Sequence, residues 1–478
     1  MLKRTTVVDE GIGIFLRKLQ MKKNIKRLLL LLIVVALGYG IIYAWRALPI
    51  ITGYGAKDMC SCVFVGNRNP DDVTKKELGR KPFSLGSFSV DMKDSSATGT
   101  FFGMAKRKAI FRRGLGCTLI NDLTEKQVRS QSFNLDFSTS INQDTIAWPA
   151  GNLLTDSFPK EINNEQLKNA VAEAFAEPAK EKLRQTRAVL ILYDGKIIFE
   201  KYENGFTEKS VFTGWSMAKS VTSALVGILV RQGKLNINDT SLMEEWKNDP
   251  RKSITLDQLL HANSGLLWDE NYTRISAVTT MLYKKGDMAK YAIGYPLQFI
   301  PETFFQYSSG TTNIISDIVR RKTGEDYYRF PYAELFNKIG MHSAVMEPDA
   351  AGTFVGSSYC WANARDWARF GLLYLNGGVF NGQRILPEGW VKYTTTPSRG
   401  ATRGEYGAQF WLNAGAPENP IKRFYPDVPT DCFWADGYEG QDIWIIPSKK
   451  LVVVKLALQQ GNKLDDNKFL AGLIKALP

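Results

Sequence analysis

The amino-acid sequence predicts an α/β (α+β) fold, in which an antiparallel sheet is flanked by helices and a separate helical lobe, with one transmembrane helix ahead of them. Three observations support this prediction. A β-hairpin is expected near residue 194 and a second one near residue 449. About 240 largely helical residues lie between the two hairpins. The run 28–45 is apolar and uncharged. Strands from both ends of a domain, with helices inserted between them, are typical of this architecture.

The two hairpins have recognisable turns. The segments RAVLILY and KIIFEKY are joined by Asp194-Gly195, a dipeptide that favours a tight turn. Near the C-terminus, DIWIIP and KLVVVKLAL are joined by Ser-Lys-Lys, and a terminal helix is expected after Asp466. Before the first hairpin, apolar residues at helical spacing predict a helix from Asn164 to about Arg184.

The N-terminal part of the sequence indicates a membrane anchor. Residues 28–45 would span roughly 27 Å as a helix, which is close to the thickness of a bilayer's hydrocarbon core. Aromatic residues at its far end (Tyr39, Tyr43, Trp45) suit the membrane interface. The near side is basic, with Arg17, Lys18, Lys22, Lys23, Lys26 and Arg27. This asymmetry predicts a single-pass protein with a cytoplasmic N-terminus and an exported body, periplasmic in a Gram-negative bacterium.

Two alternatives to the anchor are less favoured. A cleaved signal peptide would have a shorter apolar run and an Ala-x-Ala site soon after it. A buried core helix would have a polar face, and residues 28–45 have none.

The charge is concentrated in the first quarter of the chain. The protein has 478 residues and a net charge of +13. Residues 1–48 contain nine Lys/Arg against two Asp/Glu, and residues 49–130 contain fourteen against eight. The remainder is balanced, so the basic composition requires no nucleic-acid partner. We therefore divide the chain into a basic cytoplasmic tail (1–27), the transmembrane helix (28–45), an exported lead-in segment with short strands (46–163) and the main domain (164–478).

The lead-in segment has two further features. Its basic residues could contact anionic lipid or glycan, although a solvated strand face is favoured; they are Lys106, Arg107, Lys108, Arg112 and Arg113. An exported body permits disulfides, and a bridge from Cys60 or Cys62 to Cys117 is expected, with its connectivity left open. Cys360 and Cys432 are expected to be buried thiols.

The central motif of the main domain is GWSMAKSVTSALVGILVRQGKL at 214–235. Its apolar residues recur at helical spacing, which places Ser216 at the first turn of a buried helix. Ser216 and Lys219 are three residues apart, so their side chains share one face. A lysine whose pKa is lowered by burial can take the proton of a serine hydroxyl. The competing interpretation is a serine at a helix start followed by a solvent-facing lysine.

The chain resembles the serine hydrolase superfamily of β-lactamases and penicillin-binding proteins, over roughly residues 165–478. The likeness is to its class C-like branch, which includes esterases and 6-aminohexanoate-dimer hydrolases. Six stretches match in order: WSMAKS, LDQLLHANSGL, FQYSSGTTNIISDIV, ANARDWARFGLLYLNGG, RILPEGWV and ADGYEGQDIWIIP. The resemblance implies a β-lactamase-like fold for residues 164–478.

The resemblance also implies roles for individual residues. Ser216 matches the acylated nucleophile and Lys219 its lysine partner. Tyr307 matches the tyrosine that shuttles a proton to the leaving group, and Ser309 matches the residue that holds Lys219 and Tyr307 together. A phenol beside an ammonium group is expected to have a lowered pKa, which would make Tyr307 a usable acid and base.

The third motif of the superfamily differs in this sequence. Where relatives have Lys-Thr-Gly or His-x-Gly on the last strand, this chain has Ala435-Asp436-Gly437, followed by Tyr438-Glu439-Gly440-Gln441. By resemblance, the backbone N–H groups of Ser216 and Tyr438 form the oxyanion hole, supported by Gly437 and Gln441. The missing lysine favours an ester or amide substrate over a β-lactam. Asp436 and Glu439 are expected to be solvated loop carboxylates.

Other chemistries are not favoured. Neither His261 nor His342 occupies the third-motif position, so structural roles are expected and a Ser-His-Asp triad is not. No metal-binding or nucleotide-binding motif is present, and no cofactor is expected. Aromatic side chains are candidates for the substrate pockets: Trp215, Trp268, Phe304 and Trp411.

These observations predict a membrane-anchored serine hydrolase acting on a small-molecule or peptide-like ester or amide. One alternative is a β-lactamase or DD-peptidase acting on β-lactams or cell-wall peptides. The other is a catalytically silent scaffold near the membrane.

Overall fold

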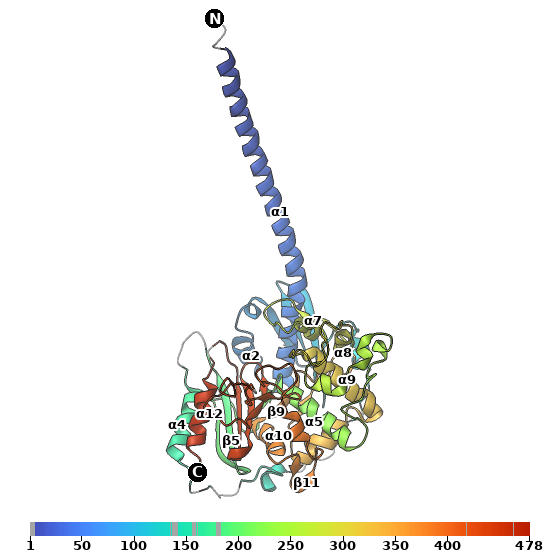
Figure 1. Ribbon diagram of the computed structural model, residues 1–478, viewed down its shortest axis with the longest axis vertical. Helices are drawn as coiled ribbons and strands as arrows, with labels where there is room; N and C mark the ends of the chain where they lie inside the picture. The colour runs from blue at the N-terminus through green and yellow to red at the C-terminus, as the bar shows by residue number, and fades with distance from the viewer. Residues whose placement is uncertain are drawn as a thin grey trace.

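The computed structural model describes residues 5–133, 135, 142–154, 159, 161–177, 183–416, 418–461 and 463–478, without the side chains of 5–14 and 17. One long helix projects from a folded body that contains the rest of the described chain (Figure 1). This helix, α1, runs from Thr5 to Phe64 with Pro49 inside it. Residues 18–64 of this helix include an 18-residue stretch that is not buried and has a mean hydropathy of 2.4. By length and composition, the helix is therefore able to cross a membrane.

The helix does not end at the expected boundary. We expected a strand-containing segment from residue 46, but α1 continues to Phe64 and enters the body. The physical reason lies in its small residues, because a Cβ atom on Gly53 would lie 2.9 Å from the Tyr283 carbonyl oxygen and one on Gly55 would lie 2.0 Å from the Phe88 ring. Neighbouring elements therefore approach the helix closely and bury its last three turns.

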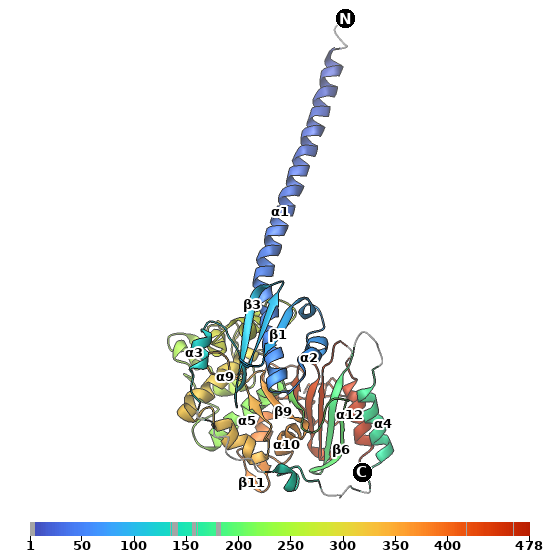
Figure 2. The same cartoon turned by 180° about the vertical axis from the view of Figure 1, so that it is seen from behind.

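The strands of the lead-in segment pack against this buried part of α1, as Figure 2 shows for β1 and β3. They form an antiparallel sheet in the order β1-β2-β3-β4. Their bounds are Ser87–Asp91, Ser96–Phe101, Met104–Arg112 and Gly116–Leu119. The short helices α2 (Pro70–Lys76), η1 (Phe83–Leu85), α3 (Glu125–Arg129) and η2 (Gln143–Thr145) also belong to the described part of this segment. The expectation of short strands here is confirmed.

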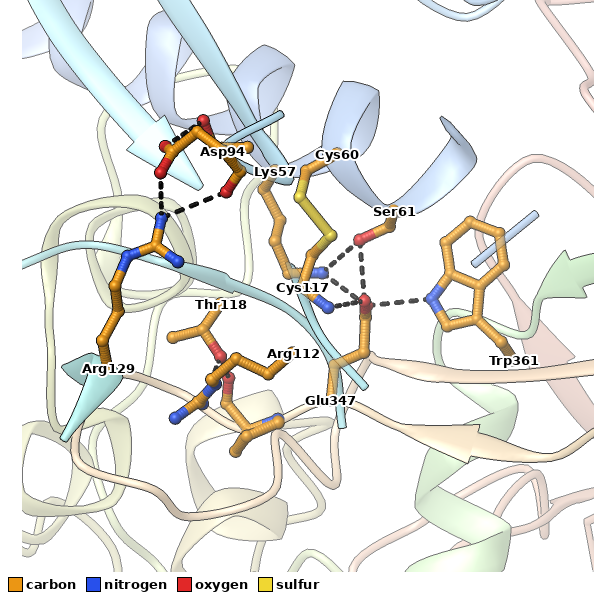
Figure 3. Close-up of a disulfide and its surroundings, with 12 residues drawn as sticks. Lys57, Cys60, Ser61, Asp94, Arg112, Cys117, Thr118, Arg129, Glu347 and Trp361 are labelled. Atoms are coloured by element: carbon orange, nitrogen blue, oxygen red, sulfur yellow. Dashed lines mark hydrogen bonds and ion pairs between the residues drawn. A yellow bond between two sulfur atoms is a disulfide. The ribbon is translucent and has the colours of Figure 1, made fainter. Parts of the chain in front are cut away.

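A disulfide and a buried polar cluster connect α1 to this sheet and to the main domain (Figure 3). Cys60 of α1 pairs with Cys117 of β4, while Cys62, Cys360 and Cys432 are buried thiols. Beside the disulfide, the Glu347 carboxylate accepts hydrogen bonds from four donors. They are the Lys57 ammonium, the Ser61 hydroxyl, the Trp361 indole N–H and the Cys117 backbone N–H.

The basic cluster of the lead-in sheet is only partly solvated. Lys106 and Arg113 are exposed, as expected of a strand face in water. Arg112 is buried instead, and its guanidinium donates hydrogen bonds to Thr118, Gln131 and the Val128 carbonyl. The prediction of a solvated side chain was therefore wrong for Arg112, because these acceptors replace water around its charge.

The central sheet of the main domain is antiparallel in the order β12-β13-β14-β15-β5-β6. Its strands are Trp411–Leu412, Phe433–Gly437, Gln441–Ile446, Leu451–Ala457, Thr186–Tyr193 and Lys196–Tyr202. Both expected hairpins are confirmed, since β5 pairs with β6 and β14 pairs with β15. The two ends of the domain meet where β15 pairs with β5.

Helices cover both faces of this sheet. Val453 of β15 packs in one core with α4 (Asn164–Phe175) and α12 (Asp466–Lys475), whereas its neighbours Val452 and Val454 pack in the other core with α10 (Ala364–Leu375). The terminal helix expected after Asp466 is confirmed, and it begins at Asp466 itself. The helix expected over 164–184 ends at Phe175, since the described residues beyond it are not helical and 178–182 lie outside the described residues.

The helical lobe lies beside the sheet. It contains α5 (Met217–Arg231), α6 (Leu256–Leu260), α7 (Ala277–Lys284), α8 (Met288–Ile293), α9 (Ser309–Thr323) and α11 (Trp390–Thr394). A small sheet lies between the helical lobe and α10, and its strand order is β7-β9-β8. These strands are Val211–Thr213, Cys360–Asn363 and Val345–Met346. A two-stranded hairpin, β10 (Val379–Phe380) and β11 (Gln383–Arg384), follows α10.

Candidate active site

Ser216 lies at a sharp turn between β7 and α5. The strand ends at Thr213, and Ser216 is the N-cap residue of α5. Between them, Trp215 has a φ of +45°, a conformation that costs energy for a residue with a bulky side chain. A Cβ atom on Gly214 would lie 2.5 Å from the Trp367 ring, so only glycine fits there. The turn thus fixes the Ser216 side chain at the start of the helix, as the sequence predicted.

Lys219 is buried beside Ser216, with only 2% of its surface exposed. Its ammonium nitrogen donates hydrogen bonds of 3.0 Å to three oxygens: Ser216 Oγ, Ser309 Oγ and the Ser357 carbonyl. Burial lowers the pKa of Lys219 to about 8, although the carboxylates of Glu270 and Asp436 act in the opposite direction. The interpretation of Lys219 as a solvent-facing lysine is excluded. A substantial fraction of this lysine is neutral at a mildly alkaline pH.

Tyr307 lies against the same lysine. The Lys219 nitrogen lies 4.7 Å from the centroid of the Tyr307 ring, and Trp411 stacks on that ring at 5.3 Å. Burial, followed by the charges of Tyr406 and Glu270, raises the pKa of Tyr307 well above its usual value, and a hydrogen bond with Ser216 only partly opposes this. The expected lowering of the pKa was therefore wrong. The Lys219 ammonium lies over the ring face, and burial of the phenol has the largest effect on its pKa.

Ser309 connects Lys219 to a carboxylate that sequence reasoning missed. Ser309 is the first residue of α9 and is fully buried. Its hydroxyl donates to Glu270, and its backbone N–H donates to the same carboxylate at 2.9 Å. Glu270 also accepts from Trp268 Nε1 and, at 3.0 Å, from the Tyr272 hydroxyl. Glu270 and Tyr272 belong to a loop, WDENY, in which no periodicity or motif marks them.

The edge of the central sheet faces the Ser216 turn at Gly437. A Cβ atom on Gly437 would lie 2.2 Å from the Gly214 carbonyl oxygen, so glycine is required for this approach. Tyr438 follows, and its ring packs edge-on against Trp215 at 5.8 Å. The Gln441 side chain donates to the Tyr438 carbonyl at 3.2 Å and to the Ala457 carbonyl, which ties the turn to β15.

Asp436 and Glu439, on either side of Gly437 and Tyr438, differ in their exposure to solvent. Asp436 is an exposed residue of β13 rather than of a loop. Glu439 is buried and forms an ion pair with Arg80 of the lead-in segment. The prediction of a solvated carboxylate was therefore wrong for Glu439, because a guanidinium from a segment far away in the sequence covers it.

A cavity of about 70 Å³ opens beside Ser216, which is room for several water molecules. Apart from Ser216, its lining consists of Ile50, Tyr54, Phe83, Trp215, Tyr272, Thr279, Tyr283, Ser358 and Tyr438. Of the four aromatic residues considered from the sequence, Trp215 lines this cavity. Trp411 stacks on Tyr307, Trp268 binds Glu270, and Phe304 packs against Phe299 at 4.5 Å.

The two histidines make other contacts. His261 is buried, with Nδ1 at 2.9 Å from the Asp257 carboxylate and its ring edge-on to Tyr393. The pKa of His342 is lowered by partial burial. Within the described residues, neither histidine forms a hydrogen bond with Ser216, and no group of three His, Cys, Asp or Glu side chains is placed to hold a metal ion.

The antiparallel sheet flanked by helices and the helical lobe place the protein in the class of β-lactamase-fold hydrolases. A family model described as Beta-lactamase matches residues 171–475, more than half of the chain, and the chain belongs to this family. The 6-aminohexanoate-dimer hydrolase of Paenarthrobacter ureafaciens is 25% identical over 296 residues, which cover 57% of this chain and 72% of that protein. The resemblance inferred from the six motifs is confirmed.

Solved structures show the same fold. A putative beta-lactamase from Bacteroides dorei has a TM-score of 0.54 at 17% identity, covering 66% of this chain and 99% of that one. A penicillin-binding protein homologue from Caulobacter crescentus has a TM-score of 0.52 at 16% identity, covering 67% of this chain and 98% of that one. The protein is thus a β-lactamase-fold hydrolase similar to 6-aminohexanoate-dimer hydrolase.

Proposed function

We propose that the protein is a membrane-anchored serine hydrolase that cleaves an ester or amide bond through an acyl-enzyme on Ser216. The observation that carries the proposal is the 3.0 Å hydrogen bond between Lys219 Nζ and Ser216 Oγ, together with a lysine pKa of about 8. A neutral lysine at this distance is able to accept the serine proton as the hydroxyl oxygen attacks a carbonyl carbon.

The remaining steps use groups around Ser216. The proposed oxyanion hole consists of the backbone N–H groups of Ser216 and Tyr438. The close approach of Gly437 to the Gly214 carbonyl, next to both residues, supports this assignment. Tyr307, hydrogen-bonded to Ser216, passes the proton to the leaving alcohol or amine. Its raised pKa keeps the phenol protonated and suits the role of an acid. Water then attacks the acyl-enzyme, and the acid product leaves.

The supporting residues keep Lys219 in place. Ser309 accepts a hydrogen bond from Lys219 and donates to Glu270, so the lysine nitrogen is held by a chain that ends on a carboxylate. Gln441 braces the turn that carries Tyr438. Because these hydrogen-bonding groups are already held in position, they need little rearrangement to stabilise the transition state.

The anchor part of the proposal rests on α1. Its apolar residues 28–45 lie outside the folded body, and a basic flank precedes them. We propose that this segment crosses the membrane with residues 1–27 in the cytoplasm and residues 46–478 exported.

Replacement of Ser216 with alanine tests the nucleophile. We expect Ser216→Ala to abolish hydrolysis of p-nitrophenyl acetate and covalent labelling by a fluorophosphonate. A matched control is Ser220→Ala, one turn further along α5, where the hydroxyl donates to the Gln409 carbonyl and lies outside the proposed machinery. This control should keep both activities. Labelling of Ser216→Ala at the wild-type level would refute the assignment.

Two substrates separate the alternatives. The third-motif triplet lacks the lysine typical of β-lactam-recognising relatives, so ester turnover is expected to exceed nitrocefin turnover. Faster nitrocefin hydrolysis would favour a β-lactamase or DD-peptidase. Absence of labelling and of turnover in folded wild-type protein would favour a catalytically silent scaffold.

A further inference from the structure

The cavity beside Ser216 is shared between the hydrolase domain and the N-terminal helix. Ile50 and Tyr54 of α1 and Phe83 of η1 form part of its wall, opposite residues of the hydrolase domain. The other large side chains that line it are aromatic: Trp215, Tyr272, Tyr283 and Tyr438. None of the residues that line it is charged. Such a wall is suited to an uncharged apolar group of the substrate.

The part of α1 that forms this wall is firmly held. Tyr54 stacks on Phe83 at 4.2 Å and on Trp215 at 6.1 Å, and Trp215 is the residue before Ser216. Gly53 lies against the Tyr283 carbonyl of α7, and Cys60 is bonded to Cys117. The same helix that is able to cross a membrane is thus a fixed part of the site, as its position beside α7 in Figure 1 illustrates.

The cavity lies close to the end of the apolar segment. Arg46 is the first charged residue after residues 28–45, and Ile50 follows it by roughly 6 Å along the helix axis. Tyr54 follows by roughly 12 Å. If residues 28–45 cross the bilayer, Ser216 and its cavity lie within a few helical turns of the membrane surface.

The tip of the β2–β3 hairpin points toward the same side. β3 runs alongside α1 in the same direction, because Ala105 accepts a hydrogen bond from Thr52 and Phe111 stacks on Phe64. The tip residues before Ala105 therefore lie toward the apolar segment. Two of them are large and exposed, Phe102 at 75% and Met104 at 52%. Exposed apolar side chains at this position suit a membrane interface.

Basic residues surround α1 where it enters the body. Lys284 of α7 donates to the Arg46 carbonyl at 3.4 Å. Burial, followed by the neighbouring charges of Arg46, Arg107 and Lys285, lowers the pKa of Lys284. These cations are gathered on one side of the molecule, where anionic lipid headgroups would neutralise them.

We infer that the substrate is a membrane amphiphile whose apolar acyl chain enters the cavity between α1 and the hydrolase domain, with its ester or amide carbonyl at Ser216. This inference rests on the proposed function. The chain is assigned to the acyl side because Tyr307, which serves the leaving group, does not line the cavity, whereas Ser216 and Tyr438 do.

The chemistry is a balanced acyl transfer. The bond between the carbonyl carbon and the leaving oxygen or nitrogen breaks as the bond to Ser216 Oγ forms. The serine proton leaves with the alcohol or amine. Water then replaces the serine and releases a fatty acid, and no redox partner is required.

The first test measures acyl-chain preference with the full-length protein in phosphatidylcholine vesicles. We expect kcat/KM for 4-methylumbelliferyl octanoate to exceed that for the acetate at least tenfold. Ile50→Trp, which fills the cavity from α1, should lower this octanoate-to-acetate ratio at least tenfold. The control is Ile42→Trp, the same substitution on the exposed apolar part of α1, which should leave the ratio unchanged. Equal rates for both esters, or an unchanged ratio in Ile50→Trp, would overturn the inference.

The second test measures delivery from the bilayer. 4-Methylumbelliferyl palmitate is placed either in the vesicles that carry the protein or in separate vesicles at the same total concentration. We expect at least tenfold faster turnover when protein and ester share a bilayer. Equal rates would show delivery through water and refute this part of the inference.

The two proposals fail in different ways. Fluorophosphonate labelling of wild-type Ser216 together with equal turnover of acetate and octanoate would overturn the amphiphile inference and leave the serine hydrolase in place. Absence of labelling in folded protein would overturn the proposed function itself.

Discussion

Lys219 is the side chain on which the proposed chemistry depends most. It is buried among two hydroxyls and a carbonyl, none of which carries a charge to balance its own. Glu270 and Asp436 favour the charged form from a distance, but burial has the larger effect. The lysine is therefore close to the point at which it exchanges its proton near neutral pH, as a general base requires.

A pH profile tests this assignment. Since the neutral form of Lys219 accepts the serine proton, kcat/KM for p-nitrophenyl acetate should rise tenfold per pH unit below about 8 and level off above it. Glu270→Gln removes a negative charge that favours the ammonium, so the rise should move to lower pH. The profile is measured by initial rates between pH 5 and 10 at constant ionic strength, after correction for spontaneous hydrolysis. A flat wild-type profile, or a shift to higher pH in Glu270→Gln, would contradict the role of Lys219.

Individual site residues could be predicted from the sequence where they belong to a motif. Ser216, Lys219, Tyr307 and Ser309 were proposed together, and the structure places them in contact. Glu270 could not be found in this way, because it reaches Ser309 from a loop whose path depends on tertiary packing. The pKa of Tyr307 was wrongly predicted, since the extent of its burial cannot be read from its neighbours in the chain.

Among the elements, α1 differs most from expectation. The uncharged apolar run and the aromatic residues at its far end predicted a transmembrane helix that ends at residue 45, but α1 continues past Pro49, Gly53 and Gly55 to Phe64. Those glycines are what allow the helix to continue, because they let Phe88 and α7 approach its backbone. The predicted hairpins were correct because a two-residue turn and alternating strands are local signals. Contacts between α1 and distant strands are not local signals, so the sequence pattern does not reveal them.

The disulfide between α1 and β4 provides a prediction for this element. It joins residues separated by 57 positions. By restricting the unfolded chain, a disulfide that closes a loop of this length adds roughly 4 kcal/mol to the free energy of unfolding. We expect Cys117→Ser to lower the thermal unfolding midpoint by several degrees, measured by differential scanning fluorimetry in detergent. Dithiothreitol serves as the control, because it should lower the midpoint of the wild type and leave that of Cys117→Ser unchanged. A midpoint of Cys117→Ser equal to that of the oxidised wild type would contradict a stabilising role.

For the whole molecule, the distribution of charge along the chain agrees with the position of α1 relative to the folded body. The net charge of +13 is carried by the first 130 residues, and the hydrolase domain is balanced. Part of this charge, at Arg46 and Arg107, lies beside Lys284 of α7 where α1 enters the body, and the basic flank lies beyond the apolar segment. The excess charge is thus located on the two sides of a proposed bilayer, which is consistent with a membrane protein and requires no nucleic acid.

This arrangement predicts a defined topology. The C-terminus lies on the side of the body away from α1, so a fused reporter should not disturb the membrane-facing surface (Figure 1). We propose that the body is exported, so in a Gram-negative host a C-terminal alkaline phosphatase fusion should be active and a C-terminal green fluorescent protein fusion dark. Replacement of the six basic flank residues by glutamine should reduce phosphatase activity at equal expression, since these charges retain the N-terminus in the cytoplasm. Replacement of Lys449 and Lys450, which lie between β14 and β15 in the folded body, by glutamine is the control and should have no effect. A fluorescent wild-type fusion with an inactive phosphatase fusion would show the opposite orientation and would place Ser216 in the cytoplasm.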